Sequence, residues 1–254
     1  MNISNIQTNG HSADSVIQIS HVQKAFGSKK VLTDISMNLF KGENLVILGR
    51  SGQGKSVAIK CMVGLLTQEE GTLIVLGLDV KNLQNKALKE LRAKVGFLFQ
   101  SAALYDSMTV RENLEFPLTR VLQLRDKNDI QQRIEEVLDA VGLADAINVM
   151  PSDLSGGMRK RIGLARTLIL KPEIMLYDEP TTGLDPITSR EISELILQMQ
   201  KKYHTSSVII THDIECAKIT ADRILVMNDG CFIAEGTFDE LKRSDNEIVN
   251  SFFK

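Results

Sequence analysis

The stretch GRSGQGKS, residues 49–56, decides the fold of this 254-residue chain. It fits the pattern G-x-x-x-x-G-K-[ST], follows the apolar run NLVILG (44–49) and begins a predicted helix from Lys55 to about Leu66. Glycines let the backbone wrap closely around phosphate groups, and N–H groups at a helix start donate to phosphate oxygens. A glycine turn before a helix also occurs by chance, but strand, loop and helix together favour a phosphate site. Lys55 would reach the β- and γ-phosphates of a nucleotide, and Ser56 would bind Mg²⁺.

A second apolar strand, within IMLYDEP (174–180), places Asp178 at its carboxyl end, where open α/β sheets bind ligands. We expect Asp178 to hold Mg²⁺ and Glu179, beside it, to orient or deprotonate an attacking water. An Asp-Glu pair at a strand end is by itself most often a solvated turn. The phosphate loop in the same chain favours the catalytic interpretation.

Three further side chains are candidates for the same site. Gln100 follows the strand VGFLF and would contact both Mg²⁺ and water, and His212 follows the strand SVIIT, where it would contact the γ-phosphate. A single histidine is more often structural, but this one shares a sheet edge with Asp178. Phe26, in KAFGSKK, would stack on adenine, although a loop aromatic more often serves for simple packing.

The stretch DLSGGMRKR (153–161) looks like a second phosphate site, because Ser155 is a predicted N-cap and two glycines after it leave backbone N–H groups exposed. Its cations, Arg159, Lys160 and Arg161, fall in the first helical turn, where they oppose the helix dipole. They form either a solvated basic turn or a site for an anion. An inserted helical region separates this stretch from the phosphate loop. We therefore expect it to bind the γ-phosphate of ATP held by a second copy, in a symmetric head-to-tail dimer.

The order of strands and helices indicates the architecture. Alternating runs between residues 16 and 40 predict antiparallel strands, and the strand–helix alternation after residue 170 predicts a parallel sheet with helices on its faces. The strand-poor stretch from about 101 to 169 is interpreted as a helical insertion in a single domain, 16–254, because no Gly/Ser/Pro-rich linker bounds it. The predicted strands are 44–49, 72–76, 95–99, 173–178, 207–211 and 223–229, and the predicted helices are 55–66, parts of 109–142, 155–170, 186–203 and 213–220.

Composition excludes several classes of protein. Hydrophobic residues make up 43% and charged residues 24%, with a net charge of −2, so we expect a soluble globular chain with no nucleic-acid partner. Cys61, Cys216 and Cys231 are odd in number and far apart, which argues against zinc and disulfides and favours a reduced, cytoplasmic chain. Residues 1–15 predict a flexible tail rather than a signal peptide, and no run of about eighteen apolar residues predicts a membrane span.

In chain order, these motifs resemble those of ATP-binding cassette (ABC) ATPases. GRSGQGKS resembles Walker A, Gln100 the Q-loop, LSGGM (154–158) the signature, IMLYDEP Walker B, Gly183-Leu184-Asp185 the D-loop and Thr211-His212-Asp213 the switch region. The resemblance covers residues 16 to about 240. It implies an α/β fold with a P-loop NTPase (RecA-like) core, an N-terminal antiparallel β subdomain and an inserted α-helical subdomain.

The same resemblance implies ATP and Mg²⁺ as cofactors and a role for each motif residue. Catalysis would fall to Glu179, His212 and Gln100, and Mg²⁺ to Ser56, Gln100 and Asp178. Nucleotide binding would involve Phe26, Gly49, Arg50, Ser51, Gly52, Gln53, Gly54, Lys55, Ser56 and Val57. The ATP of the second copy would meet Leu154, Ser155, Gly156, Gly157, Met158 and Asp185.

A narrower resemblance links GRSGQGKSV, VGFLFQSAALYDSMTVRENLEFPL, SGGMRKRIGLAR and YDEPTTGLDP to the ATPases of MCE-type lipid transporters, such as the Mla phospholipid system. TTGLDP is nearer to chloroplast and actinobacterial relatives. This resemblance implies a cytoplasmic subunit, peripheral on the cell membrane through an integral permease, in a complex with an MCE substrate-binding protein. Leu104 and Tyr105, which follow the Q-loop, would either pack into the core or face the permease.

Members of other functional classes remain as alternatives. An ATPase of iron–sulfur cluster assembly resembles a cassette but acts on a soluble scaffold. A DNA-repair or chromosome-structure ATPase would carry zinc cysteines or long heptad arms, and the sequence contains neither. A translation factor of this type would carry two cassettes in one chain.

Overall fold

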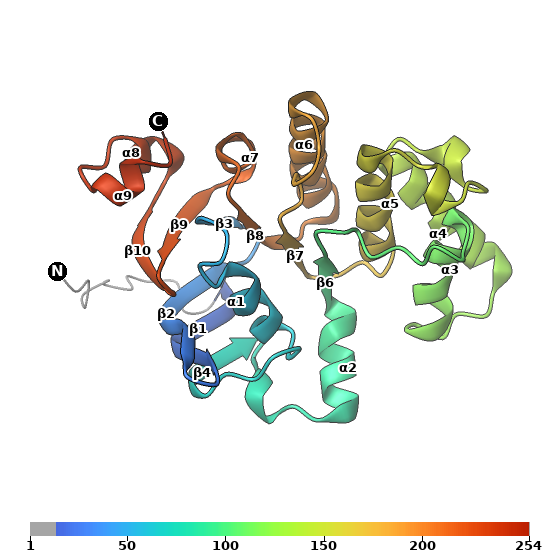
Figure 1. Cartoon of the computed structure of the whole chain (residues 1–254). Helices are drawn as coiled ribbons and strands as arrows, with labels where there is room; N and C mark the ends of the chain where they lie inside the picture. Colours follow the sequence, from blue (N-terminus) through green and yellow to red (C-terminus); the bar gives the residue numbers. More distant parts are fainter. Residues whose placement is uncertain (1–13, 254) are drawn as a thin grey trace.

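The strands of the computed structural model, which describes residues 14–253, follow one another in a single hydrogen-bonded series (Figure 1). Among these residues the order of the ten strands is β5-β4-β1-β2-β10-β9-β3-β8-β7-β6. The bounds are β1 Ser15–Phe26, β2 Lys29–Phe40, β3 Asn44–Leu48, β4 Glu70–Val75, β5 Leu78–Asp79, β6 Val95–Leu98, β7 Ile174–Asp178, β8 Ser206–Thr211, β9 Arg223–Asn228 and β10 Cys231–Gly236.

The N-terminal part of the series is antiparallel. β1 and β2 form a hairpin whose turn contains Gly27 (φ 61°), and β4 pairs with the other edge of β1. These pairings confirm the antiparallel pattern predicted for residues 16–40. Ser15, which the sequence analysis placed in the tail, is the first residue of β1, and residues 1–13 of that tail lie outside the described residues.

The rest of the series forms a core sheet that is mainly parallel. β3 lies between β8 and β9, and β7 and β6 continue the sheet beyond β8, with each of these pairings parallel. β10 pairs antiparallel with β9 and reaches β2 through one Cα pair, Cys231 with Asp34. β3, β7 and β8 are buried along their whole length, as expected for strands covered on both faces. Their carboxyl ends meet at one edge of the sheet.

Helices surround this core, and one group of helices stands beside it (Figure 1). The bounds are α1 Lys55–Met62, α2 Asn85–Lys94, α3 Val110–Arg120, α4 Lys127–Ala140, α5 Gly156–Leu168, α6 Pro186–Tyr203, α7 Ile214–Thr220, α8 Phe238–Lys242 and α9 Glu247–Asn250. Short 3-10 helices span Val80–Asn82, Ala144–Ala146 and Pro151–Asp153. α3, α4 and α5 occupy the stretch in which the sequence predicts a helical insertion.

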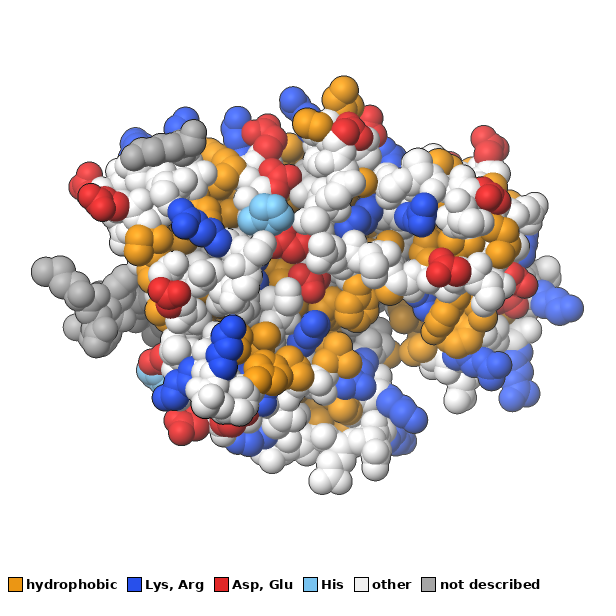
Figure 2. All heavy atoms as spheres, in the orientation of Figure 1, with side chains coloured by type: hydrophobic (Ala, Val, Ile, Leu, Met, Phe, Trp, Pro, Cys, Tyr) orange, Lys and Arg blue, Asp and Glu red, His pale blue; other side chains and the backbone are white. Residues whose placement is uncertain are grey.

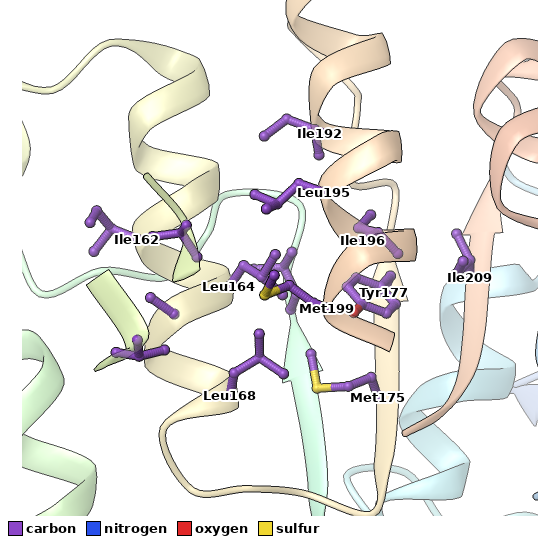
Figure 3. Packing of buried hydrophobic residues seen from close by; sticks show 14 of the residues in the cluster. Ile162, Leu164, Leu168, Met175, Tyr177, Ile192, Leu195, Ile196, Met199 and Ile209 are labelled. Atoms are coloured by element: carbon purple, nitrogen blue, oxygen red, sulfur yellow. The ribbon is translucent and has the colours of Figure 1, made fainter. Parts of the chain in front are cut away.

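Two apolar clusters fill the two faces of the core sheet. On β3, Leu45 and Ile47 belong to the cluster that includes α1, whereas Val46 and Leu48 belong to the cluster that includes α5, α6 and α7. Figure 3 shows the second cluster, in which side chains of α5 and α6 meet those of β7: Leu164, Leu168, Met175, Tyr177, Ile192, Ile196 and Met199. β3 is therefore packed from both sides, and the loop at its end starts from a rigid point.

The predicted end of the first helix is wrong. α1 ends at Met62 rather than at about Leu66, because Gly64 (φ 64°) turns the chain and the N–H of Leu65 bonds back to the carbonyl of Lys60. β5, α2, β10, α8 and α9 are absent from the sequence prediction.

Candidate active site

The phosphate loop joins β3 to α1, and close backbone contacts require two of its glycines. A Cβ on Gly49 would lie 2.7 Å from the carbonyl oxygen of Met227, and a Cβ on Gly54 (φ 104°) would lie 2.8 Å from that of Val31. Gly52 also has a positive φ, 82°, but the space that its Cβ would enter is open. The loop is thus held against β9 at its start and against β2 at its end.

The other predicted nucleotide contacts are spread around this loop. Gln53 accepts a hydrogen bond from the N–H of Asp229, Arg50 donates to Ser251 at 3.4 Å, Ser51 is exposed, and the N–H of Val57 bonds to Gly54. Phe26 lies half-exposed at the tip of the β1–β2 hairpin, with the Lys24 ammonium 5.3 Å from its ring centre. Its ring is accessible for stacking.

Lys55 and Ser56, at the start of α1, face the end of β7. The buried Lys55 ammonium donates to loop carbonyls, including that of Gly49 at 2.6 Å. The Ser56 hydroxyl donates to Oδ1 of Asp178 at 2.9 Å. Burial raises the pKa of Asp178 above its usual value, although the hydrogen bond from Ser56 acts in the opposite direction.

The Glu179 side chain links Lys55 to His212. Its backbone is left-handed (φ 50°), a strained conformation for a residue other than glycine. Oε1 lies 3.2 Å from the Lys55 ammonium, and Oε2 lies 2.8 Å from Nδ1 of His212. The Thr182 hydroxyl also donates to Oε2, at 3.3 Å, a contact that the sequence analysis missed although Thr182 lies three residues on. The structure thus brings together Lys55, Ser56, Asp178, Glu179 and His212.

Gln100 is connected to the other site residues by its backbone carbonyl. Its side chain is exposed, and its carbonyl accepts a hydrogen bond from the Lys160 ammonium at 2.5 Å. Lys160, on α5, is only 5% exposed and also donates to the carbonyl of Glu179 at 3.3 Å. Burial lowers the pKa of Lys160, while the charges of Asp178 and Glu179 oppose this shift.

The signature residues lie at the start of α5. The Ser155 hydroxyl accepts from the N–H of Met158 at 3.2 Å and caps the helix, and a Cβ on Gly157 would lie 2.6 Å from a methyl carbon of Thr188 in α6. Leu154 is buried, Gly156 lies beside Leu184, and Asp185 caps α6. Hydrogen bonds from Thr188 lower the pKa of Asp185. α5 and α6 therefore present the signature and the D-loop residue next to each other.

The three cations in the first turn of α5, which the sequence predicts to form either a solvated basic turn or an anion site, have hydrogen-bond or ion-pair partners within the chain. Lys160 donates to backbone carbonyls, Arg161 pairs with Glu191 at 2.9 Å, and Arg159 donates to the Leu154 carbonyl at 3.2 Å. Lys160 is therefore not accessible to an anion of a second copy, whereas Arg159 is exposed.

Acidic side chains gather near the centre of the face shown in Figure 2, over the ends of β7 and β8, with a histidine beside them. Residues 32–182, which run from β2 through the phosphate loop, α5 and β7, match the family model described as ABC transporter. The chain belongs to this family. It is the ATP-binding part of an ABC transporter, and it is an ATPase.

Curated ABC relatives match nearly the whole chain. The probable ribonucleotide transport ATP-binding protein mkl of Mycobacterium tuberculosis is 37% identical over 245 residues, which cover 96% of this chain and 68% of the relative. The methionine import ATP-binding protein MetN of Clostridium acetobutylicum is 38% identical over 89% of this chain and 70% of the relative. The chloroplast protein trigalactosyldiacylglycerol 3 of Arabidopsis thaliana is 36% identical over 95% of this chain and 74% of the relative.

Solved ABC ATPases share the fold. The protein cbiO1 from Clostridium perfringens, part of the ABC transporter complex cbiONQ, matches with a TM-score of 0.84 at 27% identity, over 94% of both chains. The ATP-binding cassette MJ0796, solved as a dimer in a post-hydrolysis state with ADP and Pi, matches with a TM-score of 0.79 at 30% identity, over 87% of this chain and 98% of that one. These likenesses confirm the predicted α/β P-loop NTPase fold. No helix within residues 14–253 has the length and apolar character that a membrane crossing requires.

Replacing Gly54 by Ala should reduce the affinity of this ABC ATPase for ATP about tenfold or more, a loss of about 1.4 kcal/mol. The added Cβ would press on the Val31 carbonyl, 2.8 Å away, and would displace the helix start that meets the phosphates. Calorimetric titration with ATP measures the change. Gly77→Ala, in the turn between β4 and β5, is the matched control, since its φ is also positive but its Cβ meets open space outside the phosphate loop. Equal losses in the two variants would assign the effect to general destabilisation rather than to contact with β2.

Proposed function

We propose that this chain is the ATP-hydrolysing subunit of an MCE-type lipid transporter. Two copies close head to tail on two ATP·Mg²⁺, and hydrolysis and product release reopen them and move a separate membrane permease. The observation that carries the hydrolytic part is the position of the Glu179 carboxylate, 3.2 Å from the Lys55 ammonium and 2.8 Å from His212. The proposed location is the cytoplasmic face of the membrane, through the permease.

Each side chain has a distinct task in the proposed reaction. Lys55 neutralises charge on the β- and γ-phosphates. The Glu179 carboxylate accepts a proton from the attacking water, and His212 fixes the orientation of that carboxylate and contacts the γ-phosphate. The water oxygen bonds to the γ-phosphorus, the bond from that phosphorus to the bridging oxygen breaks, and ADP leaves with the bonding electrons.

The residues at the carboxyl end of β7 and at the start of α1 fit a magnesium site. A hydroxyl and a carboxylate 2.9 Å apart, from Ser56 and Asp178, are the hard oxygen ligands that Mg²⁺ prefers. Gln100 is a proposed further ligand through its exposed side chain. When bound, Mg²⁺ supplies positive charge that stabilises the phosphate oxygens.

The signature is proposed to act on the ATP of the partner copy. α5 stands well away from α1 in Figure 1, so the signature at the start of α5 and the phosphate loop belong to separate parts of one chain. In the head-to-tail dimer, Ser155 and Gly157 donate to the γ-phosphate held by the partner, and Asp185 lies at the same interface. The dimeric state of the neighbour MJ0796 supports this arrangement.

Phospholipid or a related lipid is the proposed cargo. The motif resemblance to MCE-type ATPases supports it, as does the lipid in the name of the Arabidopsis relative, whereas two other relatives are named for ribonucleotide and for methionine.

The Mycobacterium and Clostridium relatives are named for transport and for import, which favours a transporter over an iron–sulfur scaffold ATPase. Purification from native membranes should yield a permease, an MCE protein and enriched phospholipid. Recovery with soluble scaffold proteins alone would overturn the proposal.

The permease would dock beside the loop that follows β6. A cavity of about 310 Å³ lies there between α2, β6 and α5, with apolar lining residues that include Leu65 and Phe99. Leu104 packs against the core, whereas Tyr105 is 41% exposed, with its ring centre 4.5 Å from the guanidinium of Arg166, which lines the cavity. We propose that a short permease helix enters the cavity and contacts Tyr105.

Tyr105→Ala should weaken assembly with the permease and abolish lipid transport, while ATP hydrolysis by the isolated subunit stays near the parent value. The ring has an edge contact with Phe116 at 5.1 Å and the contact with Arg166, so the expected stability loss is about 1 kcal/mol. Co-purification, lipid transfer between vesicles and thermal melting measure the three quantities. Ile248→Ala, an exposed apolar change on α9, is the control. A loss of about 2–5 kcal/mol with transport intact would show that Tyr105 belongs to the core.

A further inference from the structure

One side of α5 holds the loop that follows β6 at three successive points. Two cations of the helix donate to loop carbonyls at 2.5 Å each, and a Cβ on the glycine between them would come within 2.9 Å of the loop. The three pairs are Lys160 with Gln100, Gly163 with Ala102, and Arg166 with Ala103. Because residues three apart on a helix are neighbours, the loop lies along one side of α5 and is fixed to it.

The backbone of this loop needs such support. Ala102 and Ala103 are both left-handed, with φ of 62° and 49°, a conformation that is costly for residues other than glycine. The contacts from α5 hold the loop in this shape. The loop and α5 therefore form one unit, which also provides Gly163 and Arg166 to the wall of the cavity.

Lys160 connects this unit to Glu179. Its ammonium donates both to the Gln100 carbonyl and to the Glu179 carbonyl, and a lysine that is only 5% exposed is rare unless such partners hold it. On the other side of the same residue, the Glu179 N–H donates to the Ile210 carbonyl at 2.9 Å. Both backbone groups of Glu179 are thus fixed: the N–H by Ile210, and the carbonyl by the N–H of Thr182 at 3.3 Å together with the Lys160 side chain of α5.

We propose that Lys160 is a positioning residue, which sets the left-handed backbone of Glu179 according to the position of α5 and its loop. This inference rests on the proposed role of Glu179 as the base. A turn of the peptide after Glu179 would move its carboxylate away from His212 and from Lys55. A displacement of α5, at the cavity or at the signature, would thus be passed to the carboxylate through the Lys160 ammonium, which contacts the backbone of Glu179 directly.

Lys160→Met tests the proposal, because methionine has a similar length but donates no hydrogen bond. In the purified full-length protein, kcat should fall about 10- to 100-fold, as expected when a catalytic group is misplaced by about 1 Å, while KM for ATP changes less than about twofold. Lys160→Arg should restore most of kcat, since a guanidinium keeps donors for both carbonyls. Lys201→Met, the same change at an exposed site on α6, is the matched control.

Two outcomes would overturn the proposal. The first is a kcat within about twofold of the parent in a folded Lys160→Met protein. The second is a loss of activity in both Lys160 variants that follows their melting temperatures, which would show a structural role only. If Lys160→Met does not fold, Lys160→Gln replaces it: kcat should fall while KM for ATP changes less than about twofold. Lys160→Arg should again restore most of kcat. Failure here leaves the proposed function intact if Glu179→Gln still slows hydrolysis, whereas parental hydrolysis by Glu179→Gln would remove the role of Glu179 itself.

Discussion

Glu179→Gln should slow ATP hydrolysis by about 10²-fold or more while ATP remains bound. The amide has nearly the same shape as the carboxylate, but it does not accept a proton from water. The chain should then accumulate as a closed dimer with ATP, because hydrolysis is the step that reopens it. Phosphate release in a single turnover, binding of a fluorescent ATP analogue and gel filtration measure these three effects.

Glu173→Gln is the matched control for this change. Glu173 lies directly before β7, is half-exposed and pairs with Lys94 at 3.0 Å, so the same carboxylate-to-amide change occurs a few residues from the site. We expect its hydrolysis rate to stay within about twofold of the parent, as for surface changes generally. Parental turnover by Glu179→Gln would instead assign the base to another group.

Ser155→Arg should leave the chain folded and able to bind ATP, yet hydrolysis should collapse. Ser155 is exposed, and loss of its cap on α5 should cost about 0.5–2 kcal/mol, which most domains of this size tolerate. In the proposed dimer, however, the arginine occupies the place of the partner's γ-phosphate. Melting temperature, ATP titration and steady-state hydrolysis separate these effects.

Mixing this variant with Lys55→Ala protein gives the sharper result. One site of each mixed dimer then carries both changes and the other carries neither. With equal amounts and random pairing, half of the dimers are mixed and half of their sites are intact, so about a quarter of the parental rate should return. Mixed dimers that form and stay inactive would contradict the proposed sharing of sites.

The residues of the site that could be predicted from the sequence are those with contiguous signals. The phosphate loop combines glycines, a lysine and a serine between an apolar strand and a helix, and Asp178 and Glu179 end an apolar strand directly. Lys160, by contrast, has no local signal that indicates its burial. Its acceptors, Gln100 and Glu179, are distant in the sequence, and a cation in a first helical turn has the same pattern whether it faces its own chain or a second copy.

The helices and strands that the sequence did not predict carry weak signals of their own. Leu91 is the one residue of α2 that is buried, and five of the ten residues of this helix are charged, so its apolar signal is weak. The side chains of β10 are mostly half-buried, and its short run lacks a clear alternation. α8 and α9 span five and four residues, too few for a periodic pattern to emerge. The local signals of α8 and α9 lie in their caps: Thr237 and Glu240 form a capping box, and Asn246 caps α9.

The position of β3 in the sheet has a consequence for biosynthesis. β3 carries the phosphate loop, but its two neighbours are translated much later, β8 ending at Thr211 and β9 at Asn228. This apolar strand lacks both hydrogen-bonding neighbours until residue 211 has left the ribosome, and it lacks one of them until residue 228 has done so. Pairings between such distant segments form slowly. Exposed strand edges promote association of nascent chains. A product terminated before β9 would therefore contain the whole phosphate-loop sequence and still be an aggregation-prone fragment that binds no nucleotide.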